Sequence, residues 1–187
     1  MRQPEVDEGD IYKVTALAHS KLRNELGFVG IEAVASEKKV YVKLARQWSL
    51  DDVTDIPKEI SDLYDRFHWD NTLVAQSTGE YVIAALKTRG LPVTVITTQK
   101  LVKDPKLLQD IKVMDKIEMT EFLRKLKFNK QVIFPEQPSA NMQKLEREIP
   151  FFSKHTTEAG GVDYYAPGAK QSIISEVTMS SGSAPGA

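Results

Sequence analysis

In the first fifty residues, apolar side chains recur at every second position, which is the period of a half-buried strand. This alternation predicts strands over residues 11–20, 28–35 and 40–48. A polar loop over 21–27 and a turn at 37–39 separate them. Three consecutive strands with such short connections are typical of an antiparallel meander.

A helix follows the meander and begins near Pro57, because proline suits the first helical position. Four apolar residues at three- and four-residue steps form its expected buried face: Ile56, Ile60, Leu63 and Phe67. The aspartates just before it, Asp51, Asp52 and Asp55, are interpreted as capping residues.

A strand–helix–strand unit over residues 72–98 organises the rest of the chain. An apolar run over 72–75 turns polar at Gln76, a helix covers 80–89, and 93–98 alternates as a second strand. A crossover of this length implies parallel strands. In such sheets, ligands gather beyond the carboxyl ends of the strands, so the loop over 76–79 is the first place to expect a site.

The second half of the chain alternates between helical and extended patterns. It predicts helices over 114–128, 140–149 and 171–179, and short strands over 131–134 and 162–165. Ser139 is expected to cap the helix over 140–149. The segments 101–113 and 151–161 show no clean period and are expected to be irregular.

Length and composition narrow the class of protein. At 187 residues the chain is long enough for one domain with a sizeable core. We expect a flexible lead-in over 1–9, a domain over 10–179 and a disordered tail over 180–187. A net charge of −1 gives no global field that would recruit nucleic acid. The absence of cysteine excludes thiolate metal sites, and no run approaches the ~20 apolar residues of a membrane span.

The order βββ-α-β-α-β, followed by α-β-α-β-α, predicts an α/β fold. An antiparallel three-strand meander joined to parallel strands, with helices on both faces, is the ribonuclease-H-like mixed sheet. A fold of this kind hosts many activities and does not give a function by itself.

Several local patterns occur in one order. A strand with Ala16-Leu17-Ala18-His19-Ser20 precedes FVGIEAV, and LVAQSTGEYVIAALKTRG follows over 73–90. Three patterns come later in the chain: FNKQVIFP, MQKLEREIPFF and the turn YAPGAKQSII over 165–174. Together, over roughly residues 10–179, these patterns resemble the nuclease domain of the large terminase subunit, the DNA-packaging motor protein of tailed phages. Nothing resembles the glycine-rich phosphate loop of the packaging ATPase, so we expect the nuclease-like half alone.

The resemblance implies phosphodiester hydrolysis by two divalent cations that carboxylates hold. The family's acidic positions correspond to Ala18, Gln76, Gln171 and Ser172, none of which is an acid. Mg²⁺ and Mn²⁺ prefer charged oxygen ligands, which amides and hydroxyls replace poorly. We therefore expect no intact catalytic set, no metal and no cofactor, and a domain that acts in DNA or protein binding.

Two alternatives stay open. One is an active Mg²⁺- or Mn²⁺-dependent endonuclease with a shifted ligand set, for which the substitute residues are His19, Glu32, Glu80 and Asp163. The other is a structural or interaction module with no role in nucleic-acid binding. Glu80 also has an ordinary interpretation, because an acid in the first turn of a helix suits the helix dipole.

Basic residues cluster between positions 100 and 130 of the chain. Lys100, Lys103, Lys106 and Lys112 are the candidates for contacts with the phosphates of duplex DNA. Acidic residues interleave with them, so a solvated helical face is the competing interpretation. As further partners the resemblance implies a packaging ATPase or a portal-type protein, and as a location the host cytoplasm or the virus.

Overall fold

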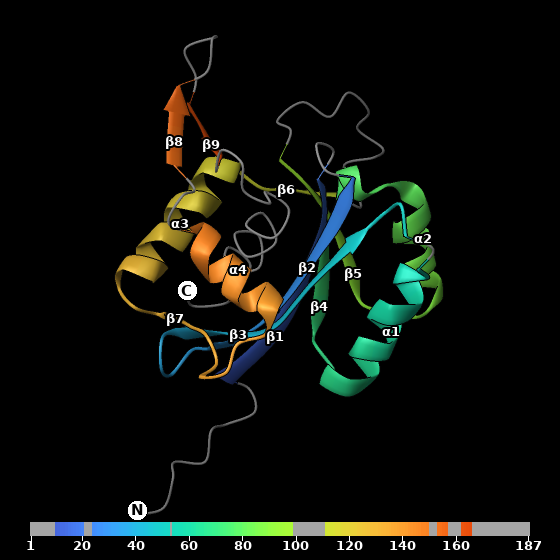
Figure 1. Ribbon diagram of the computed structural model, residues 1–187, viewed down its shortest axis with the longest axis horizontal. Coiled ribbons are helices and arrows are strands. Elements are labelled where there is room, and N and C mark those ends of the chain that lie inside the picture. The colour runs from blue at the N-terminus through green and yellow to red at the C-terminus, as the bar shows by residue number, and fades with distance from the viewer. Residues whose placement is uncertain are drawn as a thin grey trace, which may run out of the picture.

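The computed structural model describes residues 10–20, 24–52, 54–98 and 111–149, together with the backbone of 153–156 and 162–165. The main strands are β1 (Ile11–Ser20), β2 (Glu25–Val34), β3 (Lys39–Ser49), β4 (Asn71–Ala75), β5 (Val93–Thr97), β6 (Ile111–Val113) and β7 (Val132–Ile133). They form one seven-stranded sheet in the order β6-β5-β4-β1-β2-β3-β7 (Figure 1). This is the mixed sheet that the sequence predicts.

The antiparallel meander is confirmed. β1 pairs with β2 from Ile11↔Val34 to Ser20↔Glu25, and β2 pairs with β3 in the same antiparallel sense. The prediction of a loop up to residue 27 is wrong at its end, because Glu25, Leu26 and Gly27 already belong to β2. Leu26 is buried in the core, with 1% of its surface exposed. Its burial favours an earlier start of β2, although the residues before it are mostly polar.

The parallel flank is confirmed as well. β4 runs parallel to both β1 and β5, and β5 runs parallel to β6. The expectation of an irregular segment is wrong over 111–113, where β6 adds an edge strand. Three residues are too few to show a period, so only the pairing with β5 reveals this strand. Residues 101–110 of that expectation lie outside the described residues.

Helices cover both faces of the sheet. α1 (Ile56–Phe67) and α2 (Glu80–Thr88) lie on one face, and α3 (Lys116–Phe128) and α4 (Ala140–Glu148) lie on the other (Figure 1). The hydrophobic core is likewise divided into two clusters, one on each face of the sheet. Val14, Ala16 and Ala18 of β1 pack with α3 and α4, whereas Leu17 packs with α1 and α2. Alternate residues of one strand therefore fill two different cores.

The predicted helices need small corrections. α3 begins at Lys116 rather than at 114, because the Asp115 carboxylate caps it by accepting hydrogen bonds from the N–H groups of Ile117 and Glu118. Ser139 caps α4 as expected, with Oγ accepting from the Met142 N–H at 3.3 Å. Phe67, which was expected on the buried face of α1, is 41% exposed at the last residue of that helix.

A second, two-stranded sheet follows α4. β8 (Ser153–Thr156) pairs antiparallel with β9 (Val162–Tyr165), and β9 contacts α3. The expectation of a loop over 151–161 is therefore wrong over 153–156. The strand predicted over 162–165 is confirmed. The helix predicted over 171–179, the lead-in over 1–9 and the tail over 180–187 lie outside the described residues.

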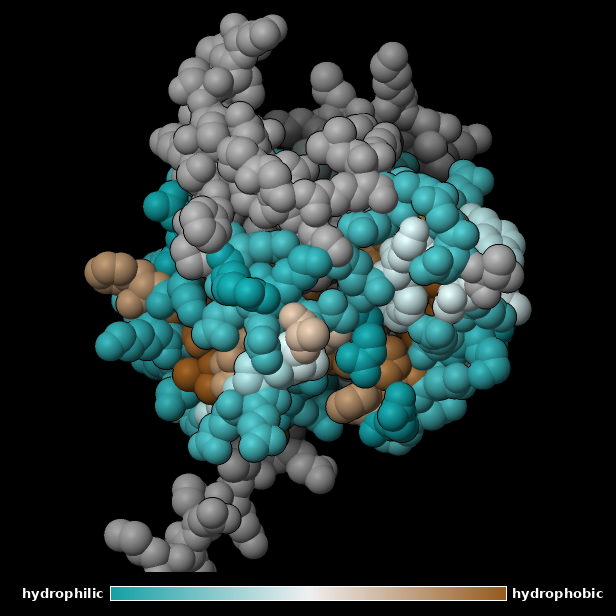
Figure 2. Space-filling view, in the orientation of Figure 1, coloured by the Kyte–Doolittle hydropathy of each residue, from teal (hydrophilic) through white to brown (hydrophobic). Residues whose placement is uncertain are grey.

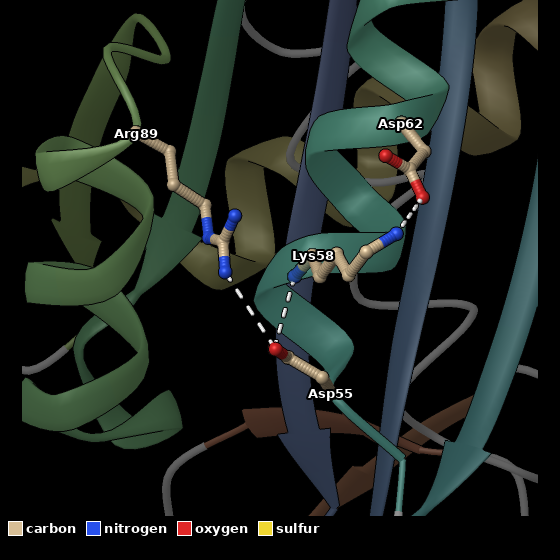
Figure 3. Close-up of polar contacts among 4 residues, drawn as sticks. All are labelled: Asp55, Lys58, Asp62 and Arg89. Carbon is tan, nitrogen blue, oxygen red and sulfur yellow. Dashed lines mark hydrogen bonds and ion pairs between the residues drawn. The ribbon is translucent and has the colours of Figure 1, made fainter.

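The first pair of helices is joined by charged side chains (Figure 3). The Asp55 carboxylate accepts a hydrogen bond from the Lys58 N–H at 3.1 Å and lies 3.6 Å from the guanidinium of Arg89, just beyond the end of α2. Lys58 Nζ also pairs with Asp62 at 2.8 Å along α1. Asp55 is thus the capping residue among the aspartates before α1. In the described part of the chain, every helix is too short or too polar to cross a membrane.

Candidate functional site

The carboxyl ends of β1 and β4 meet at one edge of the sheet. The two strands pair in parallel up to Leu17↔Val74; β4 ends one residue later, at Ala75, and β1 continues to Ser20. A 3-10 turn, η2 (Gln76–Thr78), leads from β4 to α2 and contacts both β1 and β5. This arrangement brings Ala18 of β1 and Gln76 of η2 to the same edge. It is the edge at which ligands gather in sheets of this type.

The two positions differ in chemistry and in exposure. The methyl group of Ala18 is 5% exposed and packs in the core beneath α3 and α4, so it offers no ligand atom. The Gln76 side chain is exposed, and its backbone carbonyl accepts a hydrogen bond from the Gly79 N–H at 3.2 Å. Gly79 has a φ of 102°, a conformation that side-chain-bearing residues rarely adopt, and this turns the chain into α2.

His19 lies on the other face of β1 from Ala18, because consecutive side chains of a strand point in opposite directions. Its Nε2 atom is buried and has no hydrogen-bond partner within the described residues. The same holds for Oγ1 of Thr78 in η2. Sequence reasoning missed Thr78, for which the only signal is its position in a polar loop after a buried strand.

The structure does not bring Glu32 to this edge. Ala18 stands opposite Gly27 of β2, and Glu32 is five residues further along β2, opposite Lys13. At the rise of a strand, Glu32 is therefore about 17 Å from the level of Ala18. The Glu32 side chain lies on the face of α1 and α2, and its carboxylate is 3.7 Å from Lys43 Nζ.

The other substitute acids lie on other elements. Glu80 is exposed at the first residue of α2, where its charge suits the helix dipole. Asp163 lies in β9, opposite His155, and its side chain is not among those described. Gln171 and Ser172 lie outside the described residues.

The described residues at this edge do not fit a two-metal site. An alanine methyl group and a neutral, exposed amide stand where the mechanism requires anionic oxygens. Nowhere in the described ranges do three or more His, Asp or Glu side chains come close enough to hold a metal ion. The imidazole of His19 is a single nitrogen donor on the opposite face.

Of the four lysines expected to contact DNA, the structure places one. Lys112 is exposed on the edge strand β6 and borders an open hollow of about 420 Å³ next to the start of α3. The acids Asp115 and Glu118 line the same hollow, so positive charge does not prevail there. Lys100, Lys103 and Lys106 lie outside the described residues.

Comparison with known proteins defines the class of fold. No protein-family model matches the chain, and neither does any curated protein sequence. Solved structures do match: the large terminase nuclease from thermophilic phage G20c superposes with a TM-score of 0.66 at 13% identity, over 94% of this chain and 84% of that one. The same nuclease has also been crystallised with bound cobalt and with bound zinc.

Two further matches agree. A mutant nuclease domain of the large terminase subunit of bacterial virus Sf6, crystallised with manganese and beta-thujaplicinol, gives a TM-score of 0.63 at 12% identity over 91% of this chain and 87% of that one. The large terminase of bacteriophage HK97 gives 0.62 at 13% identity, over 92% of this chain but 39% of that one. The chain therefore has the ribonuclease-H-like fold, in the form found in terminase nuclease domains.

Proposed function

We propose that this chain is a terminase-nuclease-like domain that binds DNA or a protein partner and does not cleave nucleic acid by the two-metal mechanism. The observation that carries the proposal is the pairing of β1 with β4, which brings Ala18 and Gln76 to one edge with no carboxylate at either position. A two-metal nuclease places its ligands at the ends of such strands.

Charge is the physical reason. A divalent cation at this edge needs several anionic oxygens to offset the loss of its water shell, and neutral amides and hydroxyls replace them poorly. Two buried ligand atoms in this region have no partner within the described residues: His19 Nε2, on the opposite face of β1 from Ala18, and Thr78 Oγ1, which is a neutral hydroxyl. Of the residues named for a shifted ligand set, Glu32 is remote from the edge, and Glu80 is exposed at the start of α2.

A nicking assay tests the proposal. Supercoiled plasmid is incubated with the protein and Mn²⁺, with and without a chelator, and the relaxed form is measured on a gel. We expect no nicking above the buffer control. Nicking that the chelator abolishes and that survives Gln76→Ala would overturn the proposal and favour the active endonuclease with a shifted ligand set.

The binding role is tested separately by gel shift with duplex DNA. We propose that Lys100, Lys103, Lys106 and Lys112 contact backbone phosphates, so a shift at low salt should weaken steeply as the salt concentration rises. Lys112→Gln should weaken it, whereas Lys87→Gln on α2 is the matched control. If no shift occurs at low salt, the DNA-binding role is wrong and protein binding remains as the proposed role. The partners that the resemblance suggests are a packaging ATPase or a portal-type protein.

A further inference from the structure

A second concave site lies at the other end of the sheet. A cavity of about 320 Å³ opens between the turn that joins β2 to β3 and the C-terminal half of α3. This turn is next to the start of β1, since the Ala35 N–H donates to the Asp10 carbonyl at 3.0 Å. The cavity is therefore separated by the length of β1 from the edge where Ala18 and Gln76 lie.

The floor of the cavity is apolar. It is formed by the buried side chains of Ala33, Val34, Val40 and Leu126, with Phe122 partly exposed beside them. Figure 2 shows hydrophobic atoms, in brown, at the lower left of the molecule within a hydrophilic surround, in the region where Figure 1 places β7 and the β2–β3 turn. An apolar ring or chain placed there would be removed from water.

The mouth of the cavity is cationic. Lys38, Lys39 and Lys125 line it, all three exposed, and within the described residues none of them makes an ion pair. Glu37, the acid that precedes Lys38 in the sequence, does not line the cavity. Its carboxylate accepts a hydrogen bond from the Tyr41 hydroxyl. Three positive charges therefore surround an apolar floor without a matching set of carboxylates.

The cavity is preformed. The Lys38 N–H donates to the Ala35 carbonyl at 3.1 Å, and the Val40 N–H donates to the Gln131 carbonyl at 2.8 Å. Gln131 Nε2 returns a hydrogen bond to the Lys38 carbonyl at 2.7 Å. These bonds join the turn to the chain after α3, so a ligand would enter without first ordering the walls.

We propose that this cavity binds a small organic anion, with its apolar ring or chain on the floor and its carboxylate, sulfonate or phosphate group among Lys38, Lys39 and Lys125. The volume is at the lower end of the range for small-molecule sites, about 300–1,000 Å³, and suits one compact ring system. An apolar body with one charged end matches both parts of the lining, whereas an inorganic anion matches only the mouth. The site is independent of the function proposed for the other edge.

A titration with naphthalene-2-sulfonate, followed by amide chemical shifts of the labelled protein, tests this. Neutral 2-naphthol and inorganic sulfate are titrated in parallel. We expect saturable shifts confined to residues 33–40 and 122–131, with weaker binding of 2-naphthol and no saturation by sulfate. Equal binding of 2-naphthol would show an apolar hollow only, and saturation by sulfate would show an adventitious ion only. Either result overturns the proposal.

Variants at the mouth supply the second readout. Lys39→Gln combined with Lys125→Gln should weaken naphthalene-2-sulfonate binding about tenfold, because two of the three cations are gone. Both side chains are exposed, so the thermal unfolding midpoint should stay close to that of the parent protein. Lys87→Gln on α2 removes a lysine charge remote from the cavity and, as the control, should leave binding unchanged. Unaltered affinity of the double variant would contradict the proposal.

Discussion

At the scale of single residues, a buried polar chain links the two central parallel strands. Trp69 Nε1 donates to Thr72 Oγ1 at 2.6 Å, and Thr15 Oγ1 lies 3.1 Å from the same oxygen. Thr15 and Thr72 stand opposite each other in the β1–β4 pairing. Buried donors need partners, so Thr72, which is fully buried, satisfies the indole N–H that would otherwise be left without one.

Replacing Thr72 tests this chain. Thr72→Val keeps the shape but leaves Trp69 Nε1–H without its acceptor, so we expect a loss of about 1–3 kcal/mol in the free energy of unfolding. Thr72→Ser retains the hydroxyl and should cost less than the valine. Chemical denaturation of both variants measures the difference. A valine variant as stable as the serine variant would contradict this account.

Tyr41 provides a prediction about pH. Its hydrogen bond to Glu37 raises the pKa of Tyr41 above the ordinary value of 10.0, and burial and the negative charge of Glu37 act in the same direction. Because the folded-state pKa is raised, this bond stabilises the fold fully below pH 10.0, and the contribution disappears as the pH rises through the folded-state pKa.

The test is an NMR titration of the Tyr41 ring, assigned with Tyr41→Phe. Glu37→Gln should lower the pKa of Tyr41 toward 10.0, since an amide accepts a weaker hydrogen bond and carries no charge. An unchanged titration curve would show that the carboxylate does not act on the phenol. At neutral pH the substitution should leave the pH dependence of stability unaltered.

At the scale of elements, caps and short connections decide where helices begin. Asp55 caps α1 and also faces Arg89 at the end of α2 (Figure 3). The cap matters more than the ion pair, because both partners of the pair are substantially exposed and water screens their attraction.

Asp55→Ala should therefore lower the free energy of unfolding by about 1 kcal/mol, the usual effect of losing an N-cap. Asp52→Ala is the control, since Asp52 is exposed and caps no helix. Asp55→Asn separates the two interactions, because it keeps the cap and removes the charge facing Arg89. An asparagine variant as unstable as the alanine variant would assign the effect to the ion pair.

At the scale of the whole molecule, the sheet brings distant segments to one edge. β1 and β4 are separated in sequence by β2, β3 and α1, yet they are neighbours in space. A metal that bound there with a dissociation constant one hundredth of the Mn²⁺ concentration would stabilise the protein by about 2.7 kcal/mol. We expect no such rise in the unfolding midpoint on adding Mn²⁺, measured by differential scanning calorimetry.

Restoring the acids supplies the opposite prediction. Ala18→Asp, Gln76→Glu, Gln171→Asp and Ser172→Asp together should create a metal-dependent rise in the unfolding midpoint that the parent protein lacks. The buried position of Ala18 will lower stability without metal, so the comparison is made with and without Mn²⁺ on the same variant. No metal effect would show that these positions do not form one site.

The sequence by itself determined those features that depend on near neighbours. The strand over 11–20, the spacing of Ile56, Ile60 and Leu63, and the capping role of Ser139 are local, and the structure confirms each of them. The half-burial expected of that strand is wrong, because helices cover both faces of the sheet and residues 14–18 are all buried. The missing acids at Ala18 and Gln76 are likewise visible in the sequence alone, although the mapping of the site to these positions stays a prediction.

Only the tertiary structure decided what depends on distant partners. β6, with three residues, is too short to show a period, and β8, with the sequence SKHT, has no apolar pattern; both form by pairing, with β5 and β9 respectively. The two faces of β1 belong to different cores, which separates His19 from Ala18, and the register of β1 with β2 separates Glu32 from both. Hydrogen bonds across the sheet join residues far apart in the chain, so the spacing of residues along the sequence cannot predict which of them become neighbours.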